Sequence, residues 1–342
     1  MMITKIGPWE IPNPQTEDLA GYFRELGLEW IENIPYKQVG NLVLTLDVLR
    51  LAKSSSTRSP VILCIHGGAW RKGTNKNYNA VAFALNGYIT FNLRYRLTGE
   101  APFPANLEDC MDALGWIEEN AQRYGGNPEF IGVRGGSSGA HLALMMGLKA
   151  GKRIKAIAAA CAPSHLPALY QSTMAANHFF AKKTAETLLC RKESILPLLE
   201  AESISNPMSN ISNPEKLIEL LDEKGFASAF DMLMGYEIGE NAAVLEAASP
   251  YHLLEEMKPQ QCRELPEFLL LHGLADPLVP VYQSLMLRDK MLEKGVSVSL
   301  SLFDNAQHDY MFDHGVFCPQ RMAILLAFFD RTLRIKRQEE KK

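Results

Sequence analysis

The stretch Ile131-Gly132-Val133-Arg134-Gly135-Gly136-Ser137-Ser138-Gly139-Ala140-His141 decides the fold, because it joins an apolar run to an apolar helical pattern through a glycine-rich turn. Its centre matches the pattern G-x-S-x-G, which is typical of a nucleophilic serine on a sharp strand-to-helix turn. Ser137 has glycine two places before it and two places after it, whereas Ser138 has Ala140 two places after it. Ser137 is therefore the predicted nucleophile. The helix that follows would add backbone N–H groups suited to a developing anion.

A second glycine-rich turn lies upstream, where the apolar run Val61–Ile65 continues into His66-Gly67-Gly68-Ala69-Trp70. Small residues let a backbone approach a substrate oxygen closely, so this loop is a candidate oxyanion hole. We expect N–H donors from Gly68 and from Gly67 or Ala69, joined by the N–H of Ser138. The neighbouring imidazole of His66 is predicted to brace the loop, and the Trp70 ring is predicted to pack in the interior.

Two further strand ends supply a candidate acid and a candidate base. Asp276 follows the apolar run Phe268–His272, and His308 follows the run Val296–Phe303. Serine, then aspartate, then histidine is the chain order of α/β-hydrolases, and it differs from the order in chymotrypsin and in subtilisin. Alternatives remain in the same region: His314 for the base, and Asp304, Asp309 and Asp313 for the acid. These aspartates are close to His308 only along the chain and lack the strand-end position of Asp276.

Apolar runs and helical patterns alternate along most of the chain, which favours a mostly parallel α/β sheet covered on both faces. Strands are predicted over Leu42–Leu49, Pro60–His66, Tyr88–Leu93, Phe130–Arg134, Ile154–Cys161, Phe268–His272 and Val296–Phe303. Helices are predicted over Tyr78–Leu85, Asn106–Tyr124, Ser138–Lys149, Tyr282–Lys294 and Gln320–Arg334.

One region interrupts this alternation, because about ninety residues between Cys161 and Leu253 contain no predicted strand. Helical pieces are predicted within it over Ala185–Cys190, Ile195–Leu199 and Pro214–Lys224, with a loop over Ala201–Pro214. The region lengthens the chain between Ser137 and Asp276 far beyond what the intervening strands and helices need. We therefore predict one catalytic domain made of residues 1–161 and 251–342, with residues 162–250 inserted as a helical cap.

Composition limits the class of protein. The 342 residues are 47% hydrophobic and 22% charged, which excludes a disordered chain, a coiled coil and a collagen-like repeat. A formal net charge of -4 argues against nucleic acid as a partner, because phosphate binding needs a basic surface. No apolar run is long enough to span a membrane and no signal-peptide pattern is apparent at the N-terminus, so no membrane partner and a cytoplasmic location are expected.

The six cysteines carry no recognisable site. They are scattered, without a C-x-x-C pair or a cluster with histidines, so neither a zinc site nor a redox motif is indicated. We expect reduced thiols, no metal and no cofactor.

These motifs together resemble the lipase/esterase branch of the α/β-hydrolase superfamily that carries an HGG-type loop. The similarity extends to acetyl-ester and feruloyl-ester hydrolases and to the kynurenine-formamidase-like group. It rests on HGGAWRKG (His66–Gly73), NLRYRL (Asn92–Leu97), APFPANLED (Ala101–Asp109), GVRGGSSGAHLAL (Gly132–Leu144), ASPYHLL (Ala248–Leu254), LHGLADPLVP (Leu271–Pro280) and His308. The resemblance implies an α/β-hydrolase fold whose insertion caps the site. This chain departs from the usual pattern in having Ser138 where alanine is common and Ala69 where glycine or tyrosine is common.

Three hypotheses about function follow from the sequence. The leading one is a serine hydrolase that cleaves small or medium carboxylic esters, in the manner of a carboxylesterase or lipase, through an acyl-enzyme formed on Ser137. The second is an amide hydrolase of the arylformamidase type, and the third is a non-catalytic binding protein on a hydrolase scaffold. The acyl group, the alcohol and the oligomeric state stay open, with a homodimer among the alternatives.

Overall fold

The computed structural model describes residues 19–53, 58–76, 80–174, 227–308, 312–313 and 316–334. Its main strands are β1 (Leu28–Val39), β2 (Leu42–Leu51), β3 (Ser59–Ile65), β4 (Ile89–Leu93), β5 (Gly126–Gly136), β6 (Ala156–Ala160), β7 (Glu267–Gly273) and β8 (Val298–Phe303). They form one eight-stranded sheet in the order β1-β2-β4-β3-β5-β6-β7-β8. All neighbours from β4 to β8 pair in parallel, whereas β2 pairs antiparallel with both β1 and β4. The predicted mostly parallel sheet is confirmed.

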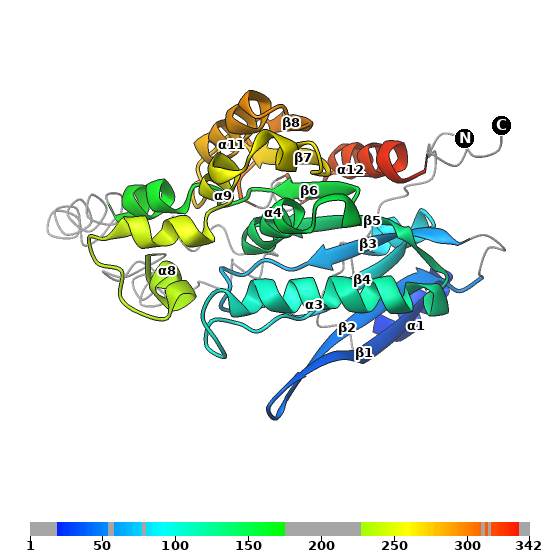
Figure 1. Ribbon diagram of the computed structural model, residues 1–342. Helices are drawn as coiled ribbons and strands as arrows, with labels where there is room; N and C mark the ends of the chain where they lie inside the picture. Colours follow the sequence, from blue (N-terminus) through cyan, green and yellow to red (C-terminus); the bar gives the residue numbers. More distant parts are fainter. Residues whose placement is uncertain are drawn as a thin grey trace, which may run out of the picture.

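Helices cover both faces of the sheet, as Figure 1 shows for α3 and α4 in front of it. The main helices are α1 (Leu19–Glu25), α2 (Ala80–Leu85), α3 (Ala105–Asn120), α4 (Ser138–Ala150), α9 (Pro250–Glu256), α11 (Tyr282–Glu293) and α12 (Pro319–Leu333). In β3, Val61 and Leu63 belong to the core shared with α3, α4 and α11, while Ile62 and Cys64 belong to the core shared with α2 and α12. Successive side chains of a strand point to opposite faces, so continuous apolar runs are what this three-layer arrangement requires.

The edge strand β1 was not predicted from the sequence. Its stretch LEWIENIPYKQV contains Pro35 and alternates poorly in polarity, because the strand has irregular register between Ile31 and Ile34 and again beyond Pro35. Asn33 has a φ of 56° at the first of these irregularities. A proline and a bulge are tolerated at the edge of a sheet, where backbone N–H groups need no second partner.

The inserted region leaves the sheet directly after β6. Its described parts, residues 162–174 and 227–250, contain a helix over 166–174, α8 (Ala227–Met234) and the 3-10 helix η3 (Ala242–Ala248), and no strand. The predicted helices over 185–190, 195–199 and 214–224 and the predicted loop over 201–214 lie outside the described residues. Because β6 stands between β5 and β7, the insertion starts between the strand that precedes Ser137 and the strand that precedes Asp276.

Two further predictions concern the state of the cysteines and the presence of membrane-spanning segments. Five cysteines lie in the described ranges and none of these is in a disulfide; all except Cys318 are buried. Cys190 lies outside those ranges. Among the described helices none combines the length and the hydropathy that a membrane crossing requires.

Candidate active site

Ser137 lies at the turn between β5 and α4, in a strained backbone conformation with φ 54° and ψ -124°. The outer glycines of the motif allow that turn. A Cβ on Gly135 would lie 2.2 Å from the carbonyl oxygen of Gly139, and a Cβ on Gly139 would lie 2.3 Å from the carbonyl oxygen of Ile65. Beyond Gly136 itself and its two chain neighbours, no heavy atom lies within 4 Å of a Cβ built on Gly136. Close packing therefore requires the first and last glycines of the motif but not the middle one.

Ser137, His308 and Asp276 come together in one hydrogen-bonded chain, although three different strands carry them. The Oγ of Ser137 is 2.9 Å from His308 Nε2, and His308 Nδ1 is 2.8 Å from the Oδ2 of Asp276. A proton on Nδ1 donates to the carboxylate, so Nε2 is left to accept the serine hydroxyl. Of the alternatives, Asp304 is exposed, and residues 309 and 314 lie outside the described part of the chain.

The carboxylate of Asp276 is held by more than the imidazole. Its Oδ1 accepts the backbone N–H groups of Leu278 at 2.9 Å and Val279 at 3.0 Å. Burial alone would raise the pKa of Asp276, but hydrogen bonds from His272 and His308 and from the Val279 N–H outweigh it and hold that pKa well below its usual value. Asp276 is therefore a carboxylate at neutral pH.

His272 is a second imidazole beside Asp276. It is fully buried, and its Nε2 lies 2.7 Å from the carbonyl oxygen of Val279 and 3.4 Å from Asp276 Oδ2. Its Nδ1 accepts from the Ser284 hydroxyl at 2.7 Å. His272 thus ties the loop after β7 to helix α11 and has a structural role. The sequence alone did not predict that the His272 imidazole lies beside the Asp276 carboxylate.

One group of side chains in the described ranges has the composition of a metal site. Cys161, His272 and Asp276 each offer a ligand atom within 4.8 Å of the others, and all three are buried. Both nitrogens of His272 have hydrogen-bond partners in the protein, and the carboxylate of Asp276 is bonded to His308 and to backbone N–H groups. Neither nitrogen of His272 is therefore free to bind a metal.

The loop after β3 lies directly against the nucleophile. A Cβ on Gly67 would lie 2.8 Å from the carbonyl oxygen of Gly136 and 3.3 Å from Ser137 Cβ, so only glycine fits there. The predicted oxyanion donors are the N–H groups of Gly67, Gly68, Ala69 and Ser138. Across the described ranges, none of these N–H groups donates to a backbone carbonyl. These N–H groups are therefore candidate donors to a substrate oxygen.

The backbone of this loop turns through left-handed conformations. Gly68, Ala69 and Trp70 have φ values of 119°, 52° and 59° in succession. Alanine and tryptophan adopt such values only at a cost, so surrounding contacts must hold the loop in place. Alanine at position 69, where glycine or tyrosine is common, keeps the backbone N–H group but places a Cβ on a residue with a left-handed backbone conformation.

His66 braces the loop, as predicted. Its Nδ1 donates to the Gly67 carbonyl at 2.8 Å, and its ring stacks on Tyr95 with centroids 4.4 Å apart. Burial lowers the pKa of His66 to about 4, so the imidazole is neutral at pH 7.

Trp70 packs in the interior, also as predicted, and it begins a chain of buried hydrogen bonds. Its indole Nε1 donates to His141 Nδ1 at 3.1 Å, and His141 Nε2 donates to the carbonyl oxygen of Ala248 at 2.6 Å. Burial lowers the pKa of His141 to about 4. This chain connects the loop after β3, the helix behind Ser137 and the returning end of the insertion.

Comparison with known proteins agrees with this arrangement. A family model described as BD-FAE matches residues 46–291, well over half of the chain. The chain belongs to the BD-FAE family. The match to this α/β-hydrolase family includes the loop after β3, the turn at Ser137 and the loop that carries Asp276, and it ends before His308.

Curated relatives of this BD-FAE family member include bacterial esterases. Esterase LipQ of Mycobacterium tuberculosis is 28% identical over 286 residues, a match that covers 81% of this chain and 56% of LipQ. Carboxylesterase NlhH of the same species is 38% identical over 90 residues, which cover 25% of this chain and 28% of NlhH. The chain thus spans about half the length of LipQ and less of NlhH.

Solved structures confirm the α/β-hydrolase fold that the sequence resemblance implies. Esterase B from Lactobacillus rhamnosis superposes with a TM-score of 0.62 at 18% identity, and the match covers 92% of this chain and 89% of that chain. The native form of Est2 from Thermogutta terrifontis superposes with a TM-score of 0.59 at 20% identity, covering 90% of this chain and 94% of that chain.

Proposed function

We propose that this BD-FAE family member is a serine carboxylesterase that hydrolyses small or medium carboxylic esters through an acyl-enzyme. One observation carries the proposal: His308 bonds Ser137 Oγ and Asp276 Oδ2 at once, at 2.9 and 2.8 Å, beside a loop whose N–H groups have no backbone acceptor in the described chain. The esterase and carboxylesterase names of LipQ and NlhH support the same class of substrate.

Acylation follows from the roles of the three side chains. His308 Nε2 takes the hydroxyl proton of Ser137 while Oγ bonds to the ester carbonyl carbon, and the carbonyl electron pair moves onto oxygen. N–H groups from Gly67, Gly68, Ala69 and Ser138 would stabilise that oxyanion. When the carbonyl re-forms, the bond to the alcohol oxygen breaks, and His308 returns the proton to the departing alcohol.

Deacylation repeats these steps with water as the nucleophile. His308 takes a proton from water while the water oxygen bonds to the acyl carbon. The bond from that carbon to Ser137 Oγ then breaks, His308 returns the proton to Oγ, and the carboxylic acid leaves. Asp276 stays ionised throughout, since its pKa is held well below its usual value. It keeps the proton on Nδ1 of His308 and stabilises the imidazolium that forms in each half-reaction.

We further propose that residues 162–250 form a cap on a catalytic domain made of residues 1–161 and 251–342. Contacts between the two ends of the insertion support this boundary. The carbonyl oxygen of Ser164 accepts the Tyr251 N–H at 2.9 Å and the Ser249 hydroxyl at 2.8 Å. The neck formed by these ends is anchored to α11, because the Gln283 side chain accepts the N–H groups of Ser164 and His165, both at 2.8 Å.

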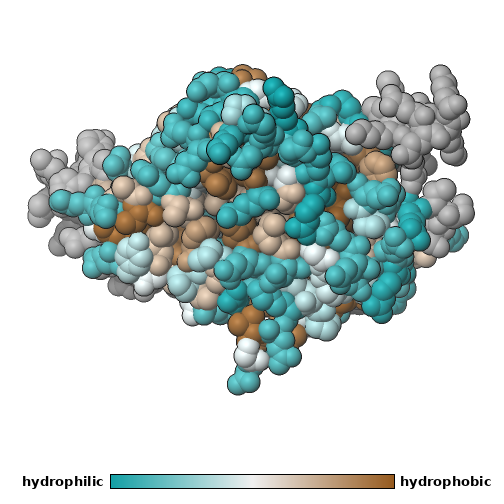
Figure 2. Space-filling view, viewed as in Figure 1, coloured by the Kyte–Doolittle hydropathy of each residue, from teal (hydrophilic) through white to brown (hydrophobic). Residues whose placement is uncertain are grey.

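Apolar surface in the insertion supports an apolar acyl group. On the face shown in Figure 2, hydrophobic side chains gather left of centre, between the places where Figure 1 labels α8 and α4, and most of the rest is hydrophilic. Within the described part of the insertion, Met174 and Tyr236 are large hydrophobic side chains that are 40% and 50% exposed.

Hydrolysis of p-nitrophenyl esters of increasing acyl length tests the proposal. Ser137→Ala should lower kcat by about 10⁵- to 10⁶-fold, whereas Ser138→Ala, which keeps the backbone N–H, should stay within about tenfold of the wild type. A fluorophosphonate probe should label the wild type and not Ser137→Ala. Full activity in Ser137→Ala would refute the assignment, and turnover of N-formylkynurenine without ester hydrolysis would indicate an amide hydrolase.

A further inference from the structure

Tyr95 is a fully buried tyrosine whose hydroxyl reaches the back of the loop after β3. Its Oη donates to the backbone carbonyl oxygen of His66 at 3.1 Å, and its ring lies almost parallel to the His66 ring, with an interplanar angle of 14°. The carbonyl of His66 and the N–H of Gly67 belong to one peptide group. Tyr95 therefore bonds one end of the peptide whose other end is a candidate oxyanion donor.

A hydrogen bond to a peptide carbonyl changes the N–H of the same peptide. It draws electron density toward oxygen, so the N–H becomes a stronger donor, and this cooperative effect is largest where water is absent. Tyr95 meets that condition because its side chain is fully buried. Burial also raises the pKa of Tyr95 well above its usual value and outweighs the opposing effect of the Ser138 side chain, so the phenol keeps its proton and acts as a donor.

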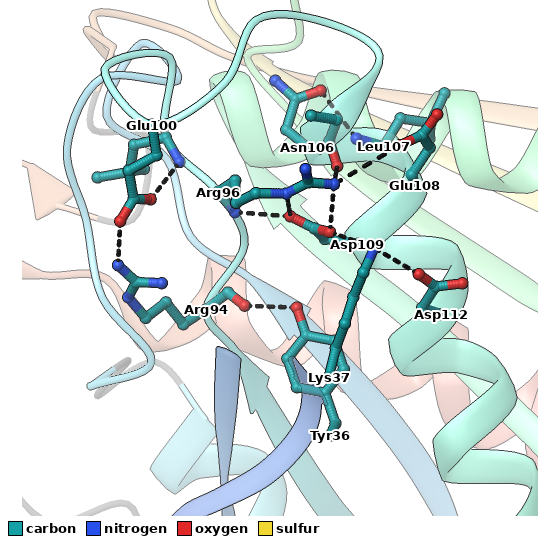
Figure 3. A network of polar contacts seen from close by, with 12 residues as sticks. Tyr36, Lys37, Arg94, Arg96, Glu100, Asn106, Leu107, Glu108, Asp109 and Asp112 are labelled. Atoms are coloured by element: carbon teal, nitrogen blue, oxygen red, sulfur yellow. Dashed lines mark hydrogen bonds and ion pairs between the residues drawn. The ribbon is translucent and has the colours of Figure 1, made fainter. Parts of the chain in front are cut away.

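The chain on both sides of Tyr95 is held firmly, as Figure 3 shows for its neighbours. The carbonyl oxygen of Arg94 accepts the Tyr36 hydroxyl at 2.7 Å. The backbone N–H of Arg96 donates to Asp109 Oδ2 at 2.9 Å, and its guanidinium donates to both carboxylate oxygens, at 2.7 and 2.8 Å. Asp109 is fully buried, so this paired charge is shielded from water. These bonds hold the backbone on both sides of Tyr95.

We propose that Tyr95 is a positioning residue that orients and polarises the His66–Gly67 peptide for oxyanion stabilisation. This inference rests on the esterase function proposed above. It assigns to the buried phenol an effect on the transition state rather than on substrate binding, since Tyr95 contacts the back of the loop and has no exposed surface.

Tyr95→Phe removes the hydroxyl and keeps the ring. Cooperative strengthening is worth roughly 10–30% of a hydrogen bond, and losing a whole oxyanion donor costs about 10²- to 10³-fold in kcat, so kcat should fall about two- to eightfold. KM should not change. A trifluoromethyl ketone, which adds to the nucleophile and forms an oxyanion, should bind more weakly by the same factor as kcat falls. Tyr88→Phe, which removes a hydroxyl bonded to Asp330 on α12, is the matched control and should leave kcat and this affinity unchanged.

A second variant separates polarisation from packing. Site-specific 3-fluorotyrosine at position 95 has nearly the same volume and a more acidic hydroxyl, so it should raise kcat, by at most about twofold. This arm decides the question if Tyr95→Phe fails to fold. Three results would each overturn the role of Tyr95. In a folded Tyr95→Phe they are an unchanged kcat with unchanged inhibitor affinity, or a fall in kcat without weaker inhibitor binding. The third is no gain in kcat with 3-fluorotyrosine. Absence of ester hydrolysis by the wild type would instead overturn the proposed function.

Discussion

Replacing Asp276 by asparagine tests how the proposed proton relay depends on a single oxygen atom. In the native loop Oδ1 accepts two backbone N–H groups, from Leu278 and Val279, so an asparagine will place its amide oxygen there. Its NH₂ group then faces His308 Nδ1, at the position where Oδ2 now accepts at 2.8 Å. A donor at this position forces the imidazole to carry its proton on Nε2, and that nitrogen can no longer accept the hydroxyl proton of Ser137.

The size of the effect follows from the wrong tautomer. We expect kcat for p-nitrophenyl acetate to fall about 10⁴-fold, or about 5 kcal/mol in activation free energy, with little change in thermal stability. Asp304→Asn is the matched control, because Asp304 is an exposed aspartate near His308 in sequence, and it should keep wild-type kcat. If folded Asp276→Asn retained more than about a tenth of wild-type kcat, Asp276 would not be the residue that orients His308.

Three further predictions concern stability. Gly135→Ala should lower the free energy of unfolding by about 3 kcal/mol or more, because the added Cβ meets backbone atoms. Gly136→Ala should lower it by less than about 1 kcal/mol, because its Cβ meets none. Equal losses in urea titration would contradict this. His66 and His141 have folded pKa values of about 4, below the usual 6.5, so stability is full above pH 6.5 and falls by about 3 kcal/mol per histidine toward pH 4. Urea titrations at several pH values check this, and His141→Gln should flatten the dependence. Asp109→Asn should cost about 2–3 kcal/mol, because it removes the buried carboxylate shared by Lys37 and Arg96 and leaves them only the exposed carboxylates of Asp112 and Glu108. A loss below about 1 kcal/mol in urea titration would contradict this prediction.

Short sequence patterns predicted the parallel strands and the positions of the three candidate catalytic residues. Each main parallel strand is a short apolar run, and the turns that follow three of them carry Ser137, Asp276 and His308. Parallel strands place their carboxyl ends at one edge, so chain order and strand-end position were enough to bring these three residues together. The edge strand β1 escaped prediction because Pro35 and its irregular register hide the alternation of polarity.

Contacts that support the site could not be predicted in the same way. Tyr95 and His66 are 29 residues apart, and Trp70 and His141 are 71 residues apart. From the sequence, each of these side chains could simply be a core residue, and each is indeed buried. Their roles depend on which backbone carbonyl or ring lies opposite them, and this is decided by strand order and helix packing rather than by any spacing in the sequence.

The buried chain from Trp70 through His141 to the carbonyl oxygen of Ala248 has a consequence for exchanging parts between relatives. Because that carbonyl is the partner of His141, the junction at which a foreign cap could be grafted lies upstream of Ala248. The acceptor is a backbone carbonyl, so a chimera that replaced Ala248 together with the cap would keep this bond only if the foreign backbone followed the same path at that position. Donor segments for altered substrate range are therefore best joined within the insertion, with residues 248–250 kept from the recipient.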